Sequence, residues 1–279
     1  MLFPGWAFAL NPAVGAHNIN TAAIAANTYT TASATITAGS TITVAVGTGA
    51  ATGCTVTGAS TYTVPTLGSG TNPIHETNDG SYLWVFTAVN ATGGSQTAAV
   101  SCPDTIWDVN LVEVQNVPTT SPIDASASLY SGTSPMNLPV TTTAANDIVF
   151  GFGYSAAGTA GRNVTFTGSG FSALDSYNDA TTTLNSADLT AATTGAHDPT
   201  YNRTGGVIAG ITIAFKPASG GSSCTHTAYV KGTGALTVPT AGSTLVYRQD
   251  GSWGTVDCLG TGSSDKYWTT QLGGNFVGN

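Results

Sequence analysis

Apolar and polar residues alternate along most of this chain of 279 residues. A period of two places alternate side chains on opposite faces of a β-strand, whereas a helix needs a period near 3.6. No segment with the helical period exceeds about two turns. Strands are predicted at residues 34–36, 41–46, 61–64, 82–89, 97–101, 106–114, 147–154, 164–167, 207–215, 227–231, 236–238 and 244–248.

Turn residues separate these strands. Residues 37–40, 78–80, 92–94 and 249–251 combine Gly with Asn, Asp, Ser or Thr, the residue types that tight turns require. Many short strands at such spacing are typical of two packed antiparallel sheets. The sequence therefore predicts an all-β chain built around a β-sandwich.

Composition supports this prediction and excludes several classes of protein. Only 7% of the residues are charged, against roughly a quarter in ordinary soluble domains, and 41% are hydrophobic. With two Glu and three Lys, the chain lacks residues that usually cover helix surfaces. Five Trp, ten Tyr and nine Phe argue against disorder.

Charge and hydropathy restrict the partners. The net charge is −8 and Lys and Arg never cluster, so nucleic acid is not an expected partner. No apolar run approaches the ~20 residues of a membrane helix. The apolar segment Leu2–Leu10 contains Pro4 and Gly5 and follows no basic residue, which does not fit a secretory signal. An extracellular composition without a signal is expected of a virion protein synthesised in the host cytoplasm.

Composition shifts predict the domain boundaries. Residues 218–223 are rich in Gly and Ser and follow an apolar strand, so they read as a linker. We expect an N-terminal arm or assembly segment at 1–30, a sandwich domain at 31–217 and a small β-domain at 224–279. No internal repeat is predicted.

The four cysteines divide between the two predicted domains. Cys54 and Cys102 lie in the first half, and Cys224 and Cys258 lie near the end, without the spacing of a zinc site. We predict two local disulfides, Cys54 with Cys102 and Cys224 with Cys258. The alternative, four buried free thiols, stays open because the oxidation state depends on the compartment.

Candidate catalytic groups do not form a recognisable site. A glycosidase needs two facing carboxylates, for which Glu76, Asp79, Asp104, Asp108 and Glu113 are the candidates. Glu113 shares a strand face with apolar residues, which favours a structural, hydrogen-bonded carboxylate. The nucleophile-like segment 153–157 lacks its second Gly. We expect no enzyme activity.

Metal-ligand patterns are also missing. The four His are far apart in sequence, which does not fit a zinc site. Asp175, Asn178 and Asp179, with Asp188 and Asp198 downstream, could supply oxygens to calcium, but the Gly and Glu of an EF-hand loop are absent. A solvated loop is the favoured interpretation, so neither metal nor cofactor is expected.

The stretch from Thr31 to Pro217 resembles the Ig-like or jelly-roll sandwich domains of bacteriophage structural proteins and bacterial surface proteins. The matching pieces are residues 38–46, 82–86, 111–114, 120–126, 146–153 and 210–216. The tail, at 229–238, 250–253 and 266–268, is similar to small β-modules of phage appendage proteins. No catalytic residue belongs to either resemblance.

The resemblance implies a virion structural protein: a capsid decoration, a head fibre, or a tail or fibre component. Its partners would be other virion proteins and copies of itself. The alternative is a glycan-binding or adhesive surface module, whose partner would be a host glycan. A depolymerising enzyme ranks last, because no carboxylate pair supports it.

Aromatic and apolar residues outside the predicted sandwich are the candidate contact residues. An uncharged N-terminal segment would be costly to leave in water, and aromatics among Gly, Ser and Asp favour a partner. Trp84 and Trp107 lie in apolar strands and are expected in the core. The predicted partner-contact residues are Leu2, Phe3, Trp6, Phe8, Trp253, Tyr267 and Trp268.

Overall fold

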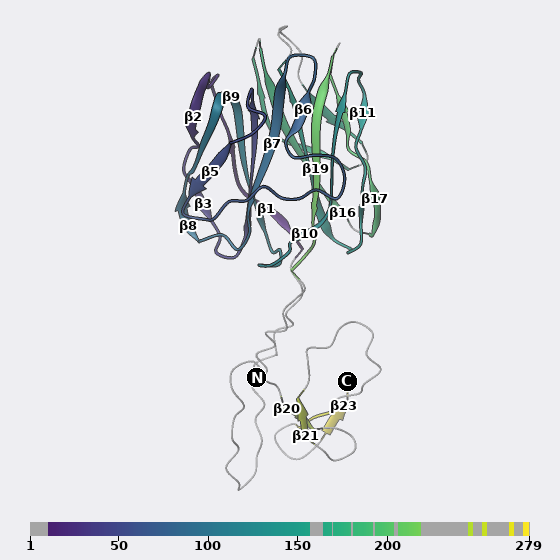
Figure 1. The fold of residues 1–279 in the computed structure, drawn as a ribbon. Coiled ribbons are helices and arrows are strands. Elements are labelled where there is room, and N and C mark those ends of the chain that lie inside the picture. The colour runs from purple at the N-terminus through teal and green to yellow at the C-terminus, as the bar shows by residue number, and fades with distance from the viewer. Residues whose placement is uncertain are drawn as a thin grey trace. The chain divides into compact units, whose positions relative to one another are not determined.

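The regular structure of the described part of this chain is entirely β (Figure 1). A computed structural model describes residues 11–218, except 157–163, 169, 180, 192 and 204–205, and the backbone of four short strands near the C-terminus. The described residues contain no helix, and so none that could cross a membrane. All strand pairs are antiparallel, which confirms the predicted all-β sandwich class.

The first sandwich contains nine strands. Its main sheet has the order β1-β9-β4-β7-β6. The 18-residue β9 also continues into the opposite layer, where its first half pairs with β2 and β5. The strands are β1 (Ala13–Ile19), β2 (Ala26–Thr30), β3 (Ala34–Ile36), β4 (Thr41–Thr48), β5 (Thr55–Gly58), β6 (Ile74–Glu76), β7 (Ser81–Ala88), β8 (Gly94–Gln96) and β9 (Ala98–Gln115).

The described residues of the second sandwich form ten strands. Its main sheet has the order β10-β19-β13-β16-β15 and is accompanied by the small sheets β11-β18-β14 and β12-β17. The strands are β10 (Ile123–Ser131), β11 (Met136–Asn137), β12 (Val140–Thr142), β13 (Asp147–Ser155), β14 (Thr165–Thr167), β15 (Ser172–Asn178), β16 (Thr183–Ala191), β17 (Gly195–His197), β18 (Thr200–Asn202) and β19 (Ile208–Phe215).

The two sandwiches share one topology. Taken in chain order, each strand of the second occupies the place of one in the first, with β18 and β19 matching the two halves of β9. The small sheets β11-β18-β14 and β12-β17 repeat β2-β9-β5 and β3-β8. The chain therefore contains a structural repeat that the sequence did not predict.

The strand registers and turns match as well. Val44 pairs with Phe86 and Leu111, and at the equivalent place Gly151 pairs with Ala187 and Thr212. Gly39 and Asn146, shortly before the two central strands, have positive φ, and so do Gly94 and Gly195, the first residues of β8 and β17. Equivalent residues can therefore be paired one to one along the central strands.

Three apolar cores are stacked on one another. One fills the first sandwich, around Val44, Trp84 and Leu111. Another fills the second sandwich, around Val149, Tyr201 and Ile208. Between them, the main sheets pack face to face through a shared core that includes Leu83, Val112, Phe150, Phe152 and Ile213. Since β4, β13 and β19 are covered on both faces, every residue in them is buried.

The predicted domain start at Thr31 needs correction. Residues 13–19 and 26–30, expected in an N-terminal arm, form β1 and β2 and pair with β9. Strand β1 is mostly half-buried and β2 is polar and mostly exposed, and neither alternates clearly between apolar and polar residues, so hydropathy gave little sign of a sheet edge. Residues 1–10 lie outside the described residues.

A second compact unit contains the remaining strands, whereas the two sandwiches together span Leu10–Ser219. Its described strands are β20 (Leu245–Tyr247), β21 (Trp253–Thr255), β22 (Trp268–Thr270) and β23 (Phe276–Gly278), in the order β21-β20-β22-β23. The predicted strand at 244–248 corresponds to β20, and those at 227–231 and 236–238 lie outside the described residues.

The core assignment predicts how the chain responds to truncation of single leucines. Leu111 is 1% exposed, and Leu129 on β10 is 42% exposed. Replacing Leu111 with Ala should lower the free energy of unfolding by about 2–5 kcal/mol, because the cavity cannot fully collapse. The control Leu129→Ala should change it by less than about 0.5 kcal/mol. Denaturant unfolding measures both, and equal effects would contradict this core.

Candidate functional site: the junction between the sandwiches

Small and large side chains meet where the two central strands face each other. Alternation along each strand places every second residue on the shared face. On β4 these residues are all small, and on β13 they are all large. The β4 residues are Thr41, Thr43, Ala45 and Gly47, and the β13 residues are Ile148, Phe150, Phe152 and Tyr154.

Gly47 and Tyr154 make the closest of these contacts. A Cβ atom built on Gly47 would lie 2.1 Å from Cε2 of Tyr154 and 2.6 Å from its Cδ2. The tyrosine ring therefore lies directly on the backbone of β4, and only glycine leaves it room. Gly47 pairs with Leu83 and Asp108, and Tyr154 pairs with Leu184 and Ala209, so the two residues occupy equivalent places in their sandwiches.

A polar cluster holds one side of the junction. Asp175 on β15 accepts a hydrogen bond from Asn110 Nδ2 on β9 at 2.7 Å. Its other oxygen lies 2.9 Å from His17 Nδ1 on β1. Asn110 Nδ2 also donates to the carbonyl of Asn18 at 3.0 Å. One carboxylate of the second sandwich thereby links two strands of the first.

Two carboxyl groups lie fully buried at the end of the junction near Tyr154. Glu76 Oε2 accepts from Ser81 Oγ at 3.0 Å and from the amide of Ala156 at 3.2 Å. Asp108 Oδ1 accepts from Asn20 Nδ2 at 3.4 Å. Burial is the main cause that raises the pKa of Glu76 and of Asp108 to about 7.

Four buried oxygens at this end of the junction have no hydrogen-bond partner among the described residues. Glu76 Oε1, Asp108 Oδ2, Tyr154 Oη and Ser155 Oγ are buried and form no hydrogen bond with a described residue. Burial also raises the pKa of Tyr154 well above its ordinary value, with Asp108 adding to it. Protonation of the two carboxyl groups is the least costly arrangement here, because a buried carboxylate without a full set of donors is strongly disfavoured.

Two other carboxylates hold the turns before the central strands. Glu113 on β9 accepts from the amides of Thr37 at 2.6 Å and Ala16 at 2.8 Å. Burial alone would raise its pKa, but these hydrogen bonds outweigh burial and lower it. This geometry agrees with the structural interpretation of Glu113. In the second sandwich Asp124 accepts from the amides of Thr143 and Ala144.

Asp124 also lies next to a third buried carboxyl group. Burial, with the neighbouring Asp124, raises the pKa of Asp147 to about 7, and both of its oxygens lack a described donor. For Asp124 itself, burial would raise the pKa, but hydrogen bonds from Thr143 and Ala144 lower it. The pKa values of these two neighbouring carboxyl groups are therefore shifted in opposite directions.

Of the remaining carboxylates, Asp79 neighbours Glu76 and, after burial as the larger cause, adds to the rise of its pKa. Asp79 and Asp104 are both exposed; Asp79 accepts from the amide of Ser81, and Asp104, within β9, accepts from the amide of Thr105. Among the calcium candidates, Asp179 accepts from the amides of Thr181 and Thr182, whereas Asp175 belongs to the junction. The described residues contain no group of three His, Cys, Asp or Glu side chains that could hold a metal.

Sequence reasoning missed the residues that make the junction. No recognisable motif marks His17, Asn110 or Tyr154 as a junction residue. Gly47 directly follows the strand predicted at 41–46 and was not distinguished from an ordinary strand end. Trp84 is buried in the first core as expected, and Trp107 packs at the edge of the shared core. The only sequence signal was the uniformly apolar strand at 147–154, which is typical of a strand covered on both faces.

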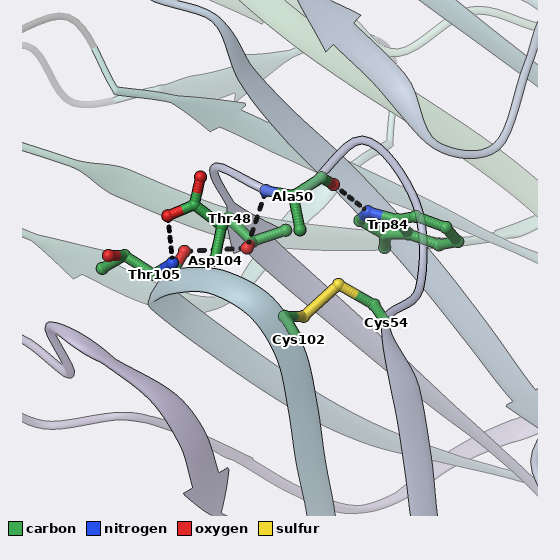
Figure 2. The surroundings of a disulfide bond; sticks show 7 residues. All are labelled: Thr48, Ala50, Cys54, Trp84, Cys102, Asp104 and Thr105. Carbon is green, nitrogen blue, oxygen red and sulfur yellow. Dashed lines mark hydrogen bonds between the residues drawn. A yellow bond between two sulfur atoms is a disulfide. The ribbon is translucent and has the colours of Figure 1, made fainter.

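The predicted disulfide between Cys54 and Cys102 is present, with Cα atoms 4.1 Å apart (Figure 2). It joins the residue before β5 to the first half of β9 in the outer layer. Figure 2 shows Trp84 beside it, whose Nε1 donates to the carbonyl of Ala50 at 2.8 Å. Thr48 Oγ1 donates to the carbonyl of Thr105 at 2.7 Å. The loop from β4 to β5 is therefore fixed from several sides.

The other predicted pair and the contact residues are not described at the side-chain level. Cys224 and Cys258, and Leu2, Phe3, Trp6, Phe8 and Tyr267, lie outside the described residues. Trp253 and Trp268 have a described backbone only, and Tyr247 on β20 pairs with both.

No protein family model, curated protein or solved structure matches this chain.

Loss of the described disulfide should destabilise the first sandwich. In a chain with Cys224→Ser and Cys258→Ser, the further changes Cys54→Ser and Cys102→Ser should cost about 4 kcal/mol, as expected for a loop of 48 residues. Reductant should lower the stability of the parent, the chain with only Cys224→Ser and Cys258→Ser, by a similar amount. It should leave the stability of the four-fold variant unchanged. Denaturant unfolding measures both. A parent whose stability ignores reductant would contradict a formed bond.

The buried acids predict an unusual pH dependence. Their pKa values are about 7 in the folded chain, above their ordinary values of 4.5 for Glu76 and 3.8 for Asp108 and Asp147, so folding takes up protons between these limits. The stability they contribute is complete below the ordinary values and is lost as pH rises through about 7. The melting temperature should therefore be higher at about pH 5 than at about pH 8.

Substitution of the acids tests this cause. The double variant Glu76→Gln, Asp108→Asn should show a smaller difference in melting temperature between the two pH values, because the amides do not titrate. The exposed Asp104→Asn is the matched control and should keep the full difference. An unchanged difference in the double variant would show that other groups are responsible.

Proposed function

We propose that this chain is a structural component of a bacteriophage particle, either a capsid decoration or head fibre or part of the tail or a fibre. It would act by assembly and surface contact and would catalyse no reaction. The partners of such a component are other virion proteins and further copies of the chain, and it works on an extracellular particle.

The observation that carries this proposal is the continuous stack of three cores. Two sandwiches that share a sheet-to-sheet core form one block without a flexible joint, and the disulfide adds a covalent link in the outer layer. A rigid block of this kind suits a mechanical or spacing role. The charge-poor sequence, with hydroxyl and amide side chains outside, is consistent with a protein that functions outside a cell.

The placement of the carboxyl groups favours a non-catalytic role. General acid and nucleophile must both reach the substrate. Glu76, Asp108 and Glu113 are 0% exposed and form hydrogen bonds with the chain's own backbone and side chains. These groups serve the junction and the turns instead.

Particle composition tests the proposal. Particles purified by density gradient from a lysate of the host that carries the gene should contain the chain in stoichiometric amounts, detected by quantitative mass spectrometry. Antibodies against residues 11–218 should label those particles in electron micrographs. A chain found in the lysate and missing from the particles would refute a virion role.

A specific surface feature supports the alternative of glycan binding. Thr28, Ser101 and Thr55 form one row across three strands of the outer sheet of the first sandwich, and all three are exposed. In the second sandwich Asn137, Thr200 and Thr167 form a corresponding row. Such rows offer hydrogen-bond donors and acceptors to a sugar. Binding on a glycan array, lost in Thr28→Val with Thr55→Val, would favour this function over a purely structural one.

A further inference from the structure

The contacts between the two sandwiches follow a twofold pattern. Strand β1 of the first lies against β15 of the second, and its counterpart β10 lies against β6, the counterpart of β15. In the same way β9 lies against β16 while β19 lies against β7, and β4 lies against its own counterpart β13. This reciprocity is the mark of an isologous interface, as in a symmetric dimer.

The side chains break that symmetry at its centre. Gly47 and Tyr154 are counterparts, yet they touch each other, so they lie close to the twofold axis. Along the same strands Ala45 is the counterpart of Phe152, and Thr43 of Phe150. The first sandwich supplies a shallow face, and the second supplies the side chains that fill it.

Pairing of like with like would fail for opposite reasons. Two copies of the first sandwich would place small residues against small residues and leave voids, which cost free energy with their volume. Two copies of the second would place two tyrosines at the axis and phenylalanines beside them, which overpacks the interface. Only the pairing of one first sandwich with one second sandwich fills the interface without voids or overpacking.

The edges of the junction are also different in the two halves. At one edge, Asp175 bonds to Asn110 and lies against His17. At the equivalent edge, a loop of the first sandwich pairs with β10: the amide of Ser69 donates to the carbonyl of Ser126 at 3.2 Å, and Ser128 returns the bond at 3.1 Å. Each edge therefore has contacts that the equivalent edge lacks: side-chain contacts of Asp175 at one, and backbone hydrogen bonds of Ser69 at the other.

We propose that residues 13–117 and 123–217 are the two halves of a fused pseudo-dimer, and that the inner face of each half is a docking surface specific for the other half. The specificity comes from the small β4 face against the large β13 face, with Gly47 and Tyr154 at its centre. Copies of the chain must consequently meet through outer sheets and edges, because the inner faces are already occupied. The inference does not depend on a virion role.

Cleavage of the connection tests the docking directly. Protease sites inserted between Thr119 and Thr120, both exposed, and next to Leu10 and Ser219, the limits of the sandwich unit, allow the folded chain to be cut into the two halves after purification. Cys224→Ser and Cys258→Ser remove any bond between the products, and the Cys54–Cys102 bond lies within the first half. The halves should stay together as a one-to-one complex in native mass spectrometry. Folded halves that separate, or that form like pairs, would overturn the proposal.

Exchange of the central residues tests the specificity. In the cleaved chain, Gly47→Tyr and Tyr154→Gly should each weaken the complex at least 100-fold. The double variant moves the large side chain to the equivalent place on the other half and should regain at least tenfold over either single variant. Gly132→Ala, where an added Cβ meets nothing within 4 Å, is the control and should bind as the parent does.

The binding results are interpreted only for variants that fold. Circular dichroism before cleavage shows whether each variant remains all-β, and the parent cleavage result stands even if a variant does not fold. A double variant that binds no better than the weaker single variant, with all chains folded, would show that the two positions do not face each other across a twofold axis.

Discussion

The packing of the small face of β4 against the large face of β13 is the constraint on which the rest of the molecule depends. It covers both main sheets on their second face, so every residue of β4, β13 and β19 is buried. It also fixes register, because a slip of one residue in either strand would turn its core residues toward the wrong layer. The Tyr154 ring on Gly47 leaves no room for such a slip.

The same packing explains the buried acids. A junction between sheets that closes over Glu76 and Asp108 removes them from water, and their pKa values rise because few donors compensate. Glu113 shows the opposite shift: backbone amides donate hydrogen bonds to its carboxylate, and its pKa falls. Glu76, Asp108 and Glu113 thus act as parts of the interior of this charge-poor chain.

Much of the fold was predictable, and the pairing of the halves was not. Period-two patterns located the central strands, since 41–46 and 147–154 fall within β4 and β13. Residues 61–64 were predicted as a strand but form only a single bridge, from Thr63 to Thr87. Residues 97–101 and 106–114 were predicted as two strands and are one, β9, because its residues pair on both sides across the change of layer. The Cys54–Cys102 pair was predictable because both residues flank strands that could meet.

The repeat escaped sequence reasoning for a physical reason. Ile42 and Ile148 look like matching positions, but Ile42 faces the first core and Ile148 faces the shared core. The structural counterpart of Ile42 is Val149, one residue further on. Because the two halves fill their shared face with residues of opposite size, their sequences diverge where their structures correspond most closely.

The most direct test of this account is a nuclear magnetic resonance measurement of the contact between Gly47 and Tyr154 in the intact chain. The account predicts cross-relaxation between the Gly47 α-protons and the Tyr154 ring protons, with the α-protons shifted upfield by the ring current. Random-coil shifts for Gly47, together with a Tyr154 ring open to a soluble paramagnetic quencher, would show that the two sandwiches do not share a core.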